Sequence, residues 1–416
     1  MLRYLHLFLL LGLIGGWYAL QANPPATFVE GIVGQPADLI PGRGPRNGID
    51  ETIERLLFRS LFTYNQEGKI VLDLAESYFI SKDGKTYEIA LRDALWRDGR
   101  PVTVGDVAFT FTQDPAFLDV TVEQEGERKI RFLLKDPLSS FLEVLTRPIA
   151  PAHLQEVPVF DVLGNTRFSL LEIKREGDLV KLIQLKDEGG GSIERLIFKF
   201  FSTEEELIEA AERGEIDALS SEDPSIPSFT LYESPVLSRF FALFFNLKSE
   251  NSLIKSGRFR GAAAQKTPLV SGEAVAGPLS GTWAQINLPF PRFTSAPLGK
   301  FQGKVVITVP EGGTFLETAA QIADSWEENL GIVVELKEIP PDQVEPVLAE
   351  KDFELILLGQ EVGRDPDRYH LWHSSQQDFP GQNVSSYANP RADRALEEGR
   401  KVLSRSERKT HYANFQ

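Results

Sequence analysis

The most regular alternation of apolar and polar side chains in the chain lies at Thr86–Arg92. Side chains on a strand point to opposite faces in turn, so this segment predicts a strand with one apolar face. Asp83-Gly84 tolerates the positive φ angles of a tight turn and joins it to a strand at Tyr78–Ser81. A helix is predicted to begin at Thr103, with Asp106 three residues later as its capping partner. The pattern therefore predicts a hairpin followed by a helix.

Strands alternate with helices in two later regions, which favours parallel sheets covered by helices. In the first, a strand at Ile193–Phe200 precedes a helix capped by Thr203 and Glu206, and Asp217–Leu219 returns to the sheet. A separate short strand is predicted at Thr27–Val33. The second holds strands at Val305–Val309, Ile332–Leu336 and Phe353–Leu358, a helix capped by Thr314 and Glu317 that ends at Gly331, and a helix at Pro341–Ala349. A charged amphipathic helix is predicted at Asp393–Ser404. The chain is thus expected to form two α/β lobes.

The amino-acid composition argues against several classes of function. The formal net charge of −16 argues against a nucleic-acid partner, which would need clustered Lys and Arg. The absence of cysteine excludes disulfides, thiolate catalysis and Cys-ligated metals. No nucleophile or phosphate-binding motif has the required spacing, so we expect neither an enzyme nor a cofactor. His370 and His373 have the spacing of two metal ligands on one helix face, and a metal site there is an alternative to the expectation of none.

The first residues suggest export. Leu5–Leu20 is nearly continuously apolar and follows Arg3. It is short for a membrane span, which needs about 17–25 residues. An uncleaved anchor and a cleaved signal peptide of residues 1–22 remain open, and a buried core helix is the third alternative. In the first two cases the rest of the chain lies outside the cytoplasm.

Several motifs together resemble the family 5 extracellular solute-binding proteins, the peptide, nickel and oligosaccharide receptors of ABC importers. The strongest are the runs LAES at 74–77, TYEIALRDALWRDG at 86–99 and PVTVGDVAFTF at 101–111. Others follow in the family's order at Pro137–Leu142, Arg147–Leu154, Gly214–Ala218, Phe244–Leu247, Asp352–Leu355, Asp365–Asp367, Leu371–Ser375, Tyr387–Pro390, Asp393 and Glu407-Arg408. The resemblance covers residues 28–416.

The resemblance implies a two-lobed periplasmic-binding-protein type II (Venus-flytrap) fold, of the α/β class, preceded by an N-terminal hydrophobic helix. Residues 23–50 and 156–238 would form the core of lobe I, residues 51–155 an extra subdomain of lobe I, and residues 239–416 lobe II. Relatives continue further and cross back to the first lobe, so we expect the chain to be truncated at Gln416.

The expected ligand segment is Gly359–Tyr369, because it follows a buried strand at the sheet edge where open α/β sheets bind ligands. Aromatic side chains are expected to stack on the ligand, Glu361 or Asp365 to pair a cationic group and Arg364 an anionic one. The residues expected to line the cleft are Tyr64, Phe245, Asn246, Trp283, Glu361, Arg364, Asp365 and Tyr369. A loop anchor is the alternative role for Trp283, and a local salt bridge is the alternative for Arg364 and Asp365.

Two departures from the family concern ligand choice. Peptide-binding relatives hold the peptide's α-amino group with an aspartate, where this chain has Val362, with Glu361 adjacent. Relatives often carry an aromatic residue at the position of Gln360. We therefore expect a monomeric receptor that binds a peptide or other small oligomeric ligand and delivers it to an ABC permease, held at the membrane by its N-terminal segment. The alternative is a membrane-anchored sensory or partner-binding module with a degenerate cleft.

Overall fold

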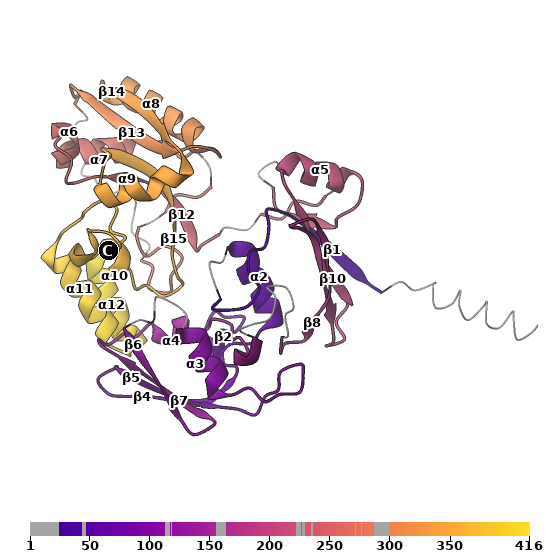
Figure 1. The fold of residues 1–416 in the computed structure, drawn as a ribbon. Coiled ribbons are helices and arrows are strands. Elements are labelled where there is room, and N and C mark those ends of the chain that lie inside the picture. The colour runs from indigo at the N-terminus through magenta and orange to yellow at the C-terminus, as the bar shows by residue number, and fades with distance from the viewer. Residues whose placement is uncertain are drawn as a thin grey trace, which may run out of the picture. The chain divides into compact units, whose positions relative to one another are not determined.

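The computed structural model describes residues 25–43, 47–112, 117, 119–154, 164–221, 226, 229–233, 236–270, 272–275, 277–286 and 299–416. They form two compact units (Figure 1). Unit 1 holds the described residues up to Asp136 and from Phe141 to Tyr232, and unit 2 holds Pro137–Ser140 and those from Glu233 onward. The predicted hydrophobic helix at Leu5–Leu20 lies outside the described residues. Among the described helices, none has the length and apolar character needed to cross a membrane. The lobe boundaries drawn from the sequence stay a prediction.

Unit 1 contains most of the strands. Its strands are β1 (Thr27–Val33), β2 (Phe62–Tyr64), β3 (Ile70–Leu72), β4 (Ala75–Ile80), β5 (Thr86–Leu91), β6 (Val120–Glu125), β7 (Lys129–Leu134), β8 (Phe168–Glu176), β9 (Leu179–Asp187), β10 (Arg195–Phe201) and β11 (Ala218–Leu219). Its helices are α2 (Gly48–Leu57), α3 (Val104–Thr112), α4 (Phe141–Val144), the 3₁₀ helix η2 (Ala152–Leu154) and α5 (Glu204–Glu212).

The larger sheet of unit 1 has the strand order β11-β1-β10-β9-β8. Strand β1 lies between β10 and β11 and runs parallel to both, so β10 and β11 are parallel to each other, as the strand–helix–strand pattern predicts. Helix α5 connects these two neighbours and packs against them, with Thr203 accepting a hydrogen bond from the Glu206 amide at its start. Gly31 of β1 lies under the helix, because a Cβ there would come within 2.4 Å of Leu207.

The predicted hairpin and helix are confirmed in a second sheet of order β4-β5-β7-β6. Gly84 supplies the left-handed turn residue, with φ of 68°. At the start of α3, Thr103 and Asp106 bond each other's backbone N–H groups, at 2.8 and 3.4 Å. Buried aromatic rings fill the space beneath the sheet, including Phe111, Phe132 and Phe141.

Unit 2 has one sheet and most of the helices. Its strands are β12 (Arg239–Phe245), β13 (Lys304–Pro310), β14 (Val333–Ile339) and β15 (Leu355–Glu361). Its helices are α6 (Ser252–Lys255), α7 (Gly257–Lys266), α8 (Phe315–Leu330), η3 (Pro341–Gln343), α9 (Val344–Glu350), α10 (Tyr369–Trp372), η4 (Ser374–Gln376), α11 (Pro390–Lys401) and α12 (Arg405–Phe415).

The unit 2 sheet has the order β12-β15-β13-β14. Strand β13 pairs in parallel with both β14 and β15, as predicted, whereas β12 lies antiparallel to β15 at the edge. The core side of this sheet packs under α7 and α8 around Trp326, whose indole N–H donates to the Ala263 carbonyl at 3.1 Å. Gly331 ends α8 in the left-handed conformation, as predicted.

Three local predictions need correction. Thr314 does precede α8, but within the described structure its side chain makes no capping hydrogen bond, because its backbone (φ −92°, ψ 11°) is not extended as a side-chain cap requires. The helix expected at Pro341–Ala349 begins as the 3₁₀ turn η3 and becomes α-helical only from Val344. The charged helix near the end is followed by a further helix, α12, which the sequence pattern did not indicate.

Candidate functional site in unit 2

The candidate ligand segment begins where β15 ends. Glu361 is the last residue of this strand and lies on the exposed side, where Arg239 of β12 contacts its carboxylate at 2.5 Å. Val362 points the other way and is buried, and its N–H donates to the Ser238 carbonyl. Because β15 and β13 are parallel, both strands end at this edge of the sheet. A carboxylate and a guanidinium are therefore exposed where open α/β sheets bind ligands.

Asp365, in the middle of the segment, is held by α12. The guanidinium of Arg408 donates to its two carboxylate oxygens at 2.7 and 2.5 Å, and both side chains are largely buried. Burial works to lower the pKa of Arg408, but the bonds to Asp365 outweigh burial and raise that pKa above its ordinary value. A buried and doubly bonded pair of this kind holds a loop in place and leaves little of the carboxylate for a ligand.

Two further arginines fix the rest of the segment. Arg368 is buried, and its guanidinium donates to the carbonyls of Pro278, Asp365 and Gly363. Arg400 of α11 contacts the Asp367 carboxylate at 2.9 Å. Residues 363–368 are therefore anchored through both backbone carbonyls and carboxylates, and the segment is preorganised.

The aromatic rings of Trp283 and Tyr369 lie against the guanidinium groups of arginines on α11 and α12. The Arg405 and Arg408 guanidinium carbons lie 4.5 and 5.3 Å from the Trp283 ring centre. The ring of Tyr369 stacks on His373, with centroids 4.1 Å apart, and lies 4.4 Å from the Arg400 guanidinium. The antiparallel helices α11 and α12, side by side in Figure 1, supply these arginines. The structure thus brings Trp283, Asp365 and Tyr369 into one cluster of cationic and aromatic groups.

Three predicted site residues lie elsewhere. Phe245 packs in the unit 2 core, stacked on Trp326 with ring centres 6.2 Å apart. Asn246 is buried, and its amide donates to the carbonyls of Lys351 and Phe353. Tyr64 belongs to unit 1, where its hydroxyl donates to the Glu143 carboxylate at 2.5 Å. The surroundings of the first two residues are those of structural side chains. Arg364, by contrast, is exposed between Glu361 and Asp365.

The histidine pair is not arranged as a metal site. His370 is exposed, whereas His373 is buried and its ring nitrogens face Ser375 and Glu397. Throughout the described part of the chain, no three His, Asp or Glu side chains converge as a metal site requires.

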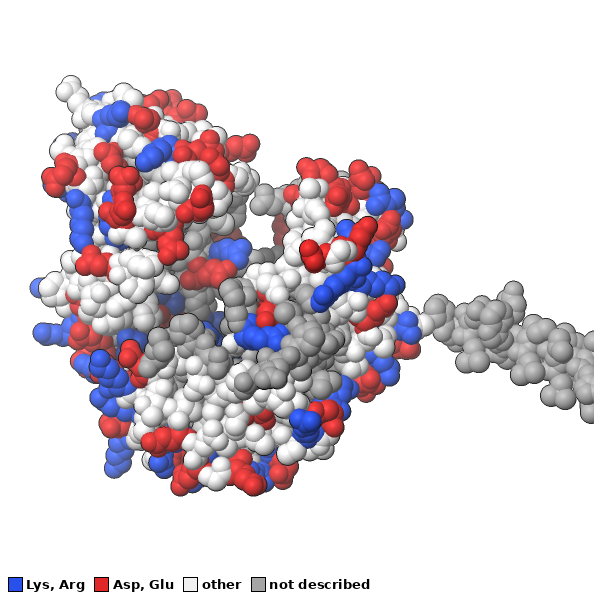
Figure 2. Space-filling model, in the orientation of Figure 1, with Lys and Arg blue, Asp and Glu red and all other residues white. Residues whose placement is uncertain are grey.

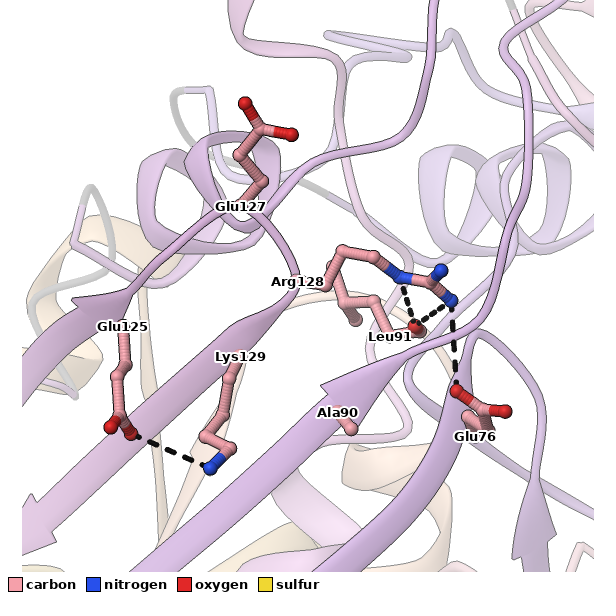
Figure 3. A pocket seen from close by; sticks show the side chains of 7 residues that line it. All are labelled: Glu76, Ala90, Leu91, Glu125, Glu127, Arg128 and Lys129. Carbon is pink, nitrogen blue, oxygen red and sulfur yellow. Dashed lines mark hydrogen bonds and ion pairs between the residues drawn. The ribbon is translucent and has the colours of Figure 1, made fainter.

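A shallow pocket of about 510 Å³ lies in unit 1, on strands β4, β5, β6 and β7 and the β6–β7 turn (Figure 3). Ala90 and Leu91 are the apolar residues of its lining. Arg128 donates to the Leu91 carbonyl and contacts Glu76, while Lys129 contacts Glu125, as the dashed lines show. Five of its seven lining residues are charged and none is aromatic, so this pocket is the weaker candidate for an organic ligand.

Sequence reasoning did not identify the residues that hold the ligand segment, Arg368, Arg400 and Arg408, or the exposed partner of Glu361, Arg239. The motif Glu407-Arg408 was a usable signal for Arg408, but a sequence alone cannot show which carboxylate a distant arginine meets. Figure 2 shows why charge by itself could not find the site, because acidic and basic side chains are spread over the visible surface, with acidic ones gathered over α5.

Comparison with known proteins supports the resemblance. The family described as bacterial extracellular solute-binding proteins, family 5, matches residues 69–265. A protein of Brucella ovis named as an ABC transporter peptide-binding protein is 30% identical over 198 residues, 42% of this chain and 38% of that relative. The chain therefore matches well under half the length of such relatives. The oligopeptide-binding protein AppA of Bacillus subtilis is 22% identical over 92% of this chain and 82% of its own length.

Solved structures show the same fold. The substrate-binding protein CtaP of Listeria monocytogenes superposes with a TM-score of 0.75 at 20% identity, over 95% of this chain and 90% of that one. Bacillus subtilis AppA, solved with a nonapeptide, gives a TM-score of 0.68 at 19% identity, over 94% and 91%. NikZ of Campylobacter jejuni, solved with Ni(L-His), gives 0.66 at 21% identity, over 94% and 90%. The predicted two-lobed α/β binding-protein fold is confirmed, and proteins of this family are ligand-binding receptors rather than enzymes. Residues 69–265 of the chain are therefore similar to the family 5 extracellular solute-binding proteins, and the chain shares the fold of these solved binding proteins.

Proposed function

We propose that this protein is the extracytoplasmic receptor of an ABC importer and delivers a peptide-like or other small oligomeric ligand to a permease. The observation that carries the proposal is the preorganised segment at the end of β15, with exposed charged groups, in a chain that is similar to this family. The names of relatives point to peptides for AppA and the Brucella protein, and NikZ was solved with a nickel complex. Peptide-like ligands are the class that most of these names share.

The proposed ligand-contacting residues are Glu361, Arg364, Trp283 and Tyr369, together with Tyr64 of unit 1. Glu361, rather than Asp365, would pair a cationic group of the ligand, because the Asp365 carboxylate is buried against Arg408, whereas the Glu361 carboxylate is exposed beside Arg239. Arg364 would pair an anionic group. A buried ligand charge needs an opposite charge beside it, so the presence of both signs suits a zwitterionic ligand. For Phe245 and Asn246 we propose a structural role.

The second candidate is a sensory or partner-binding module on the same fold, anchored in the membrane by residues 1–22. It is favoured by Val362 and Asp365, because the first stands where relatives carry the amine-binding aspartate and the second is engaged within the protein. Such a module would hold no transported solute.

Mass spectrometry of small molecules that co-purify with the full-length protein separates the two candidates. The receptor should retain a peptide-like or oligomeric solute that Glu361→Gln, Arg364→Gln protein retains less. If nothing co-purifies, and no peptide, sugar or nickel complex changes the melting temperature, transport is contradicted and the second candidate is favoured.

A further inference from the structure

An aromatic ring stands exposed beside the candidate ligand segment. Phe241 of β12 lies directly opposite Gly359 of β15 in the antiparallel ladder. A Cβ on Gly359 would lie 3.0 Å from a carbon of the Phe241 ring, so the ring rests against the glycine backbone. Phe241 also meets Phe315, the first residue of α8, edge to face with ring centres 5.7 Å apart. Although it has these contacts, 61% of Phe241 remains exposed.

The exposed pair Arg239 and Glu361 shares this face of the ladder. It lies two residues beyond the pair Phe241 and Gly359 on each strand, and side chains two apart on a strand point the same way. We define the Phe241 surface as Arg239, Phe241, Phe315, Gly359 and Glu361. It joins the two aromatic rings of Phe241 and Phe315 to a carboxylate and a guanidinium in contact.

The same face of β12 and β15 is fully packed farther from this end. Leu355 and Leu357 are buried there, with Leu243 and Phe245 packed against them. The helical cover therefore ends at Phe315, and Phe241 lies at its margin. An exposed aromatic side chain next to polar groups is a frequent feature of binding surfaces, because it offers a large apolar area with little loss of side-chain freedom.

We propose that the Phe241 surface is a subsite for an aromatic or large aliphatic side chain of a peptide-like ligand. The ligand side chain would lie against Phe241 and Phe315. The adjacent Arg239 would donate a hydrogen bond to a backbone carbonyl of the ligand, and Glu361 would accept one from a backbone N–H. The ion pair between them leaves further N–H groups on the guanidinium and further lone pairs on the carboxylate. The proposal rests on the proposed receptor function and adds a ligand preference to it.

A ligand, rather than a second copy of the chain, is the occupant that these residues favour. The surface begins at Gly359 and Glu361, which also begin the candidate ligand segment, so it is continuous with that segment. A charged pair within the surface suits a short polar backbone, whereas the core of an interface between copies is depleted in charged residues.

Calorimetric titration of the full-length protein with four tripeptides tests the subsite. The probes are Ala-Ala-Ala, Phe-Ala-Ala, Ala-Phe-Ala and Ala-Ala-Phe, and the variants are Phe241→Ala and Gly359→Ala. Phe379→Ala is the matched control, because Phe379 is an equally exposed phenylalanine (58%) of unit 2 that follows η4. Circular dichroism and size-exclusion chromatography show whether each variant is folded and monomeric.

Wild-type protein is expected to bind one Phe-containing tripeptide about tenfold more tightly than Ala-Ala-Ala, from the contact of one aromatic ring with another. Phe241→Ala should remove that preference while binding of Ala-Ala-Ala is unchanged. Gly359→Ala should reduce the preference for the Phe-containing tripeptide, because the added methyl group displaces the Phe241 ring. Phe379→Ala should keep this preference.

Wild-type binding with no such preference, or a preference that survives in Phe241→Ala, overturns the subsite and leaves the receptor function standing. A dimer that Phe241→Ala dissociates, without a change in peptide affinity, also overturns it by assigning the surface to a second copy. If the wild type binds none of the tripeptides and no other peptide, the peptide-receptor function and the subsite fail together.

Discussion

Arg408 holds Asp365 across 43 residues of sequence with two hydrogen bonds, at 2.7 and 2.5 Å. Arg408 comes from α12, whereas Asp365 lies in the loop after β15. The same guanidinium donates to the Gly399 carbonyl at the end of α11 and lies near the Trp283 ring. One buried cation therefore ties the candidate ligand segment to both C-terminal helices.

Removing Arg408 should destabilise unit 2 strongly. Arg408→Met leaves the Asp365 carboxylate buried without its partner, which typically costs about 3–5 kcal/mol. The double variant Asp365→Asn, Arg408→Met should lose less than Arg408→Met alone, because no buried charge is left unpaired. Urea unfolding followed by tryptophan fluorescence measures both losses. Equal stability of wild type and Arg408→Met would show that this pair does not anchor the segment.

Two helix starts should respond differently to loss of a threonine. Thr203→Ala removes the side-chain acceptor of the Glu206 amide at the start of α5, which should cost about 1 kcal/mol. Thr314→Ala removes no such bond from α8 and should cost much less. Hydrogen exchange of the first-turn amides of each helix measures the local change. A larger increase in exchange rate, relative to wild type, in α8 of Thr314→Ala than in α5 of Thr203→Ala would contradict the difference in capping.

Asp50 should make stability depend on pH. Burial raises the pKa of its carboxyl above the ordinary value, although its bonds to the Asn47 and Ala37 amides act in the opposite direction. The folded protein therefore binds this proton more tightly than the unfolded chain. The free energy of unfolding should fall as pH rises from the ordinary Asp pKa to the raised folded value, and the effect should level off above that value.

Asp50→Asn removes this titration. The free energy of unfolding of the variant, minus that of wild type, should increase as pH rises through the same window. A constant cost of losing the carboxylate would shift this difference equally at every pH. Urea unfolding at a series of pH values measures the difference. A difference that is constant with pH, or that moves the other way, would mean that burial does not raise this pKa.

Glu361 should contribute to ligand affinity and little to stability. Glu361→Gln removes the carboxylate proposed to pair a cationic ligand group, so affinity for the best-binding tripeptide should fall about tenfold. The control is Glu335→Gln, because Glu335 also forms an exposed ion pair, with Lys304, in the same sheet. Exposed pairs contribute little to stability, so both variants should melt near the wild type. Calorimetric titration that gives equal affinities for both variants would remove Glu361 from the site.

Local sequence signals predicted the parts of the fold that depend on local chemistry. Strand β1 has the predicted bounds, the Asp83-Gly84 turn joins β4 to β5, and Gly331 ends α8. These features follow from side-chain alternation and from the few residues that accept a left-handed backbone. The resemblance to the family could also be found, because the family's motifs recur in order along the chain.

The cluster around the ligand segment could not be derived in the same way. Helix α12 shows almost no apolar stripe, since its buried residues are Arg408 and Tyr412. Helix α2 was missed too, although Asn47 and Asp50 form a capping box at its start. Phe245 and Asn246 fitted the family's motif, but the pattern could not show that their side chains face the core and the backbone. Contacts between distant residues decide these roles, and one sequence does not contain them.

Thermal melting of the full-length protein with saturating peptide pools tests the proposed receptor function most directly. A ligand present at about 100 times its Kd should stabilise the folded protein by about 2.7 kcal/mol, which raises the melting temperature by several degrees. We expect that rise with at least one peptide pool, and a smaller rise for Glu361→Gln. An unchanged melting temperature with every peptide pool would contradict a peptide receptor.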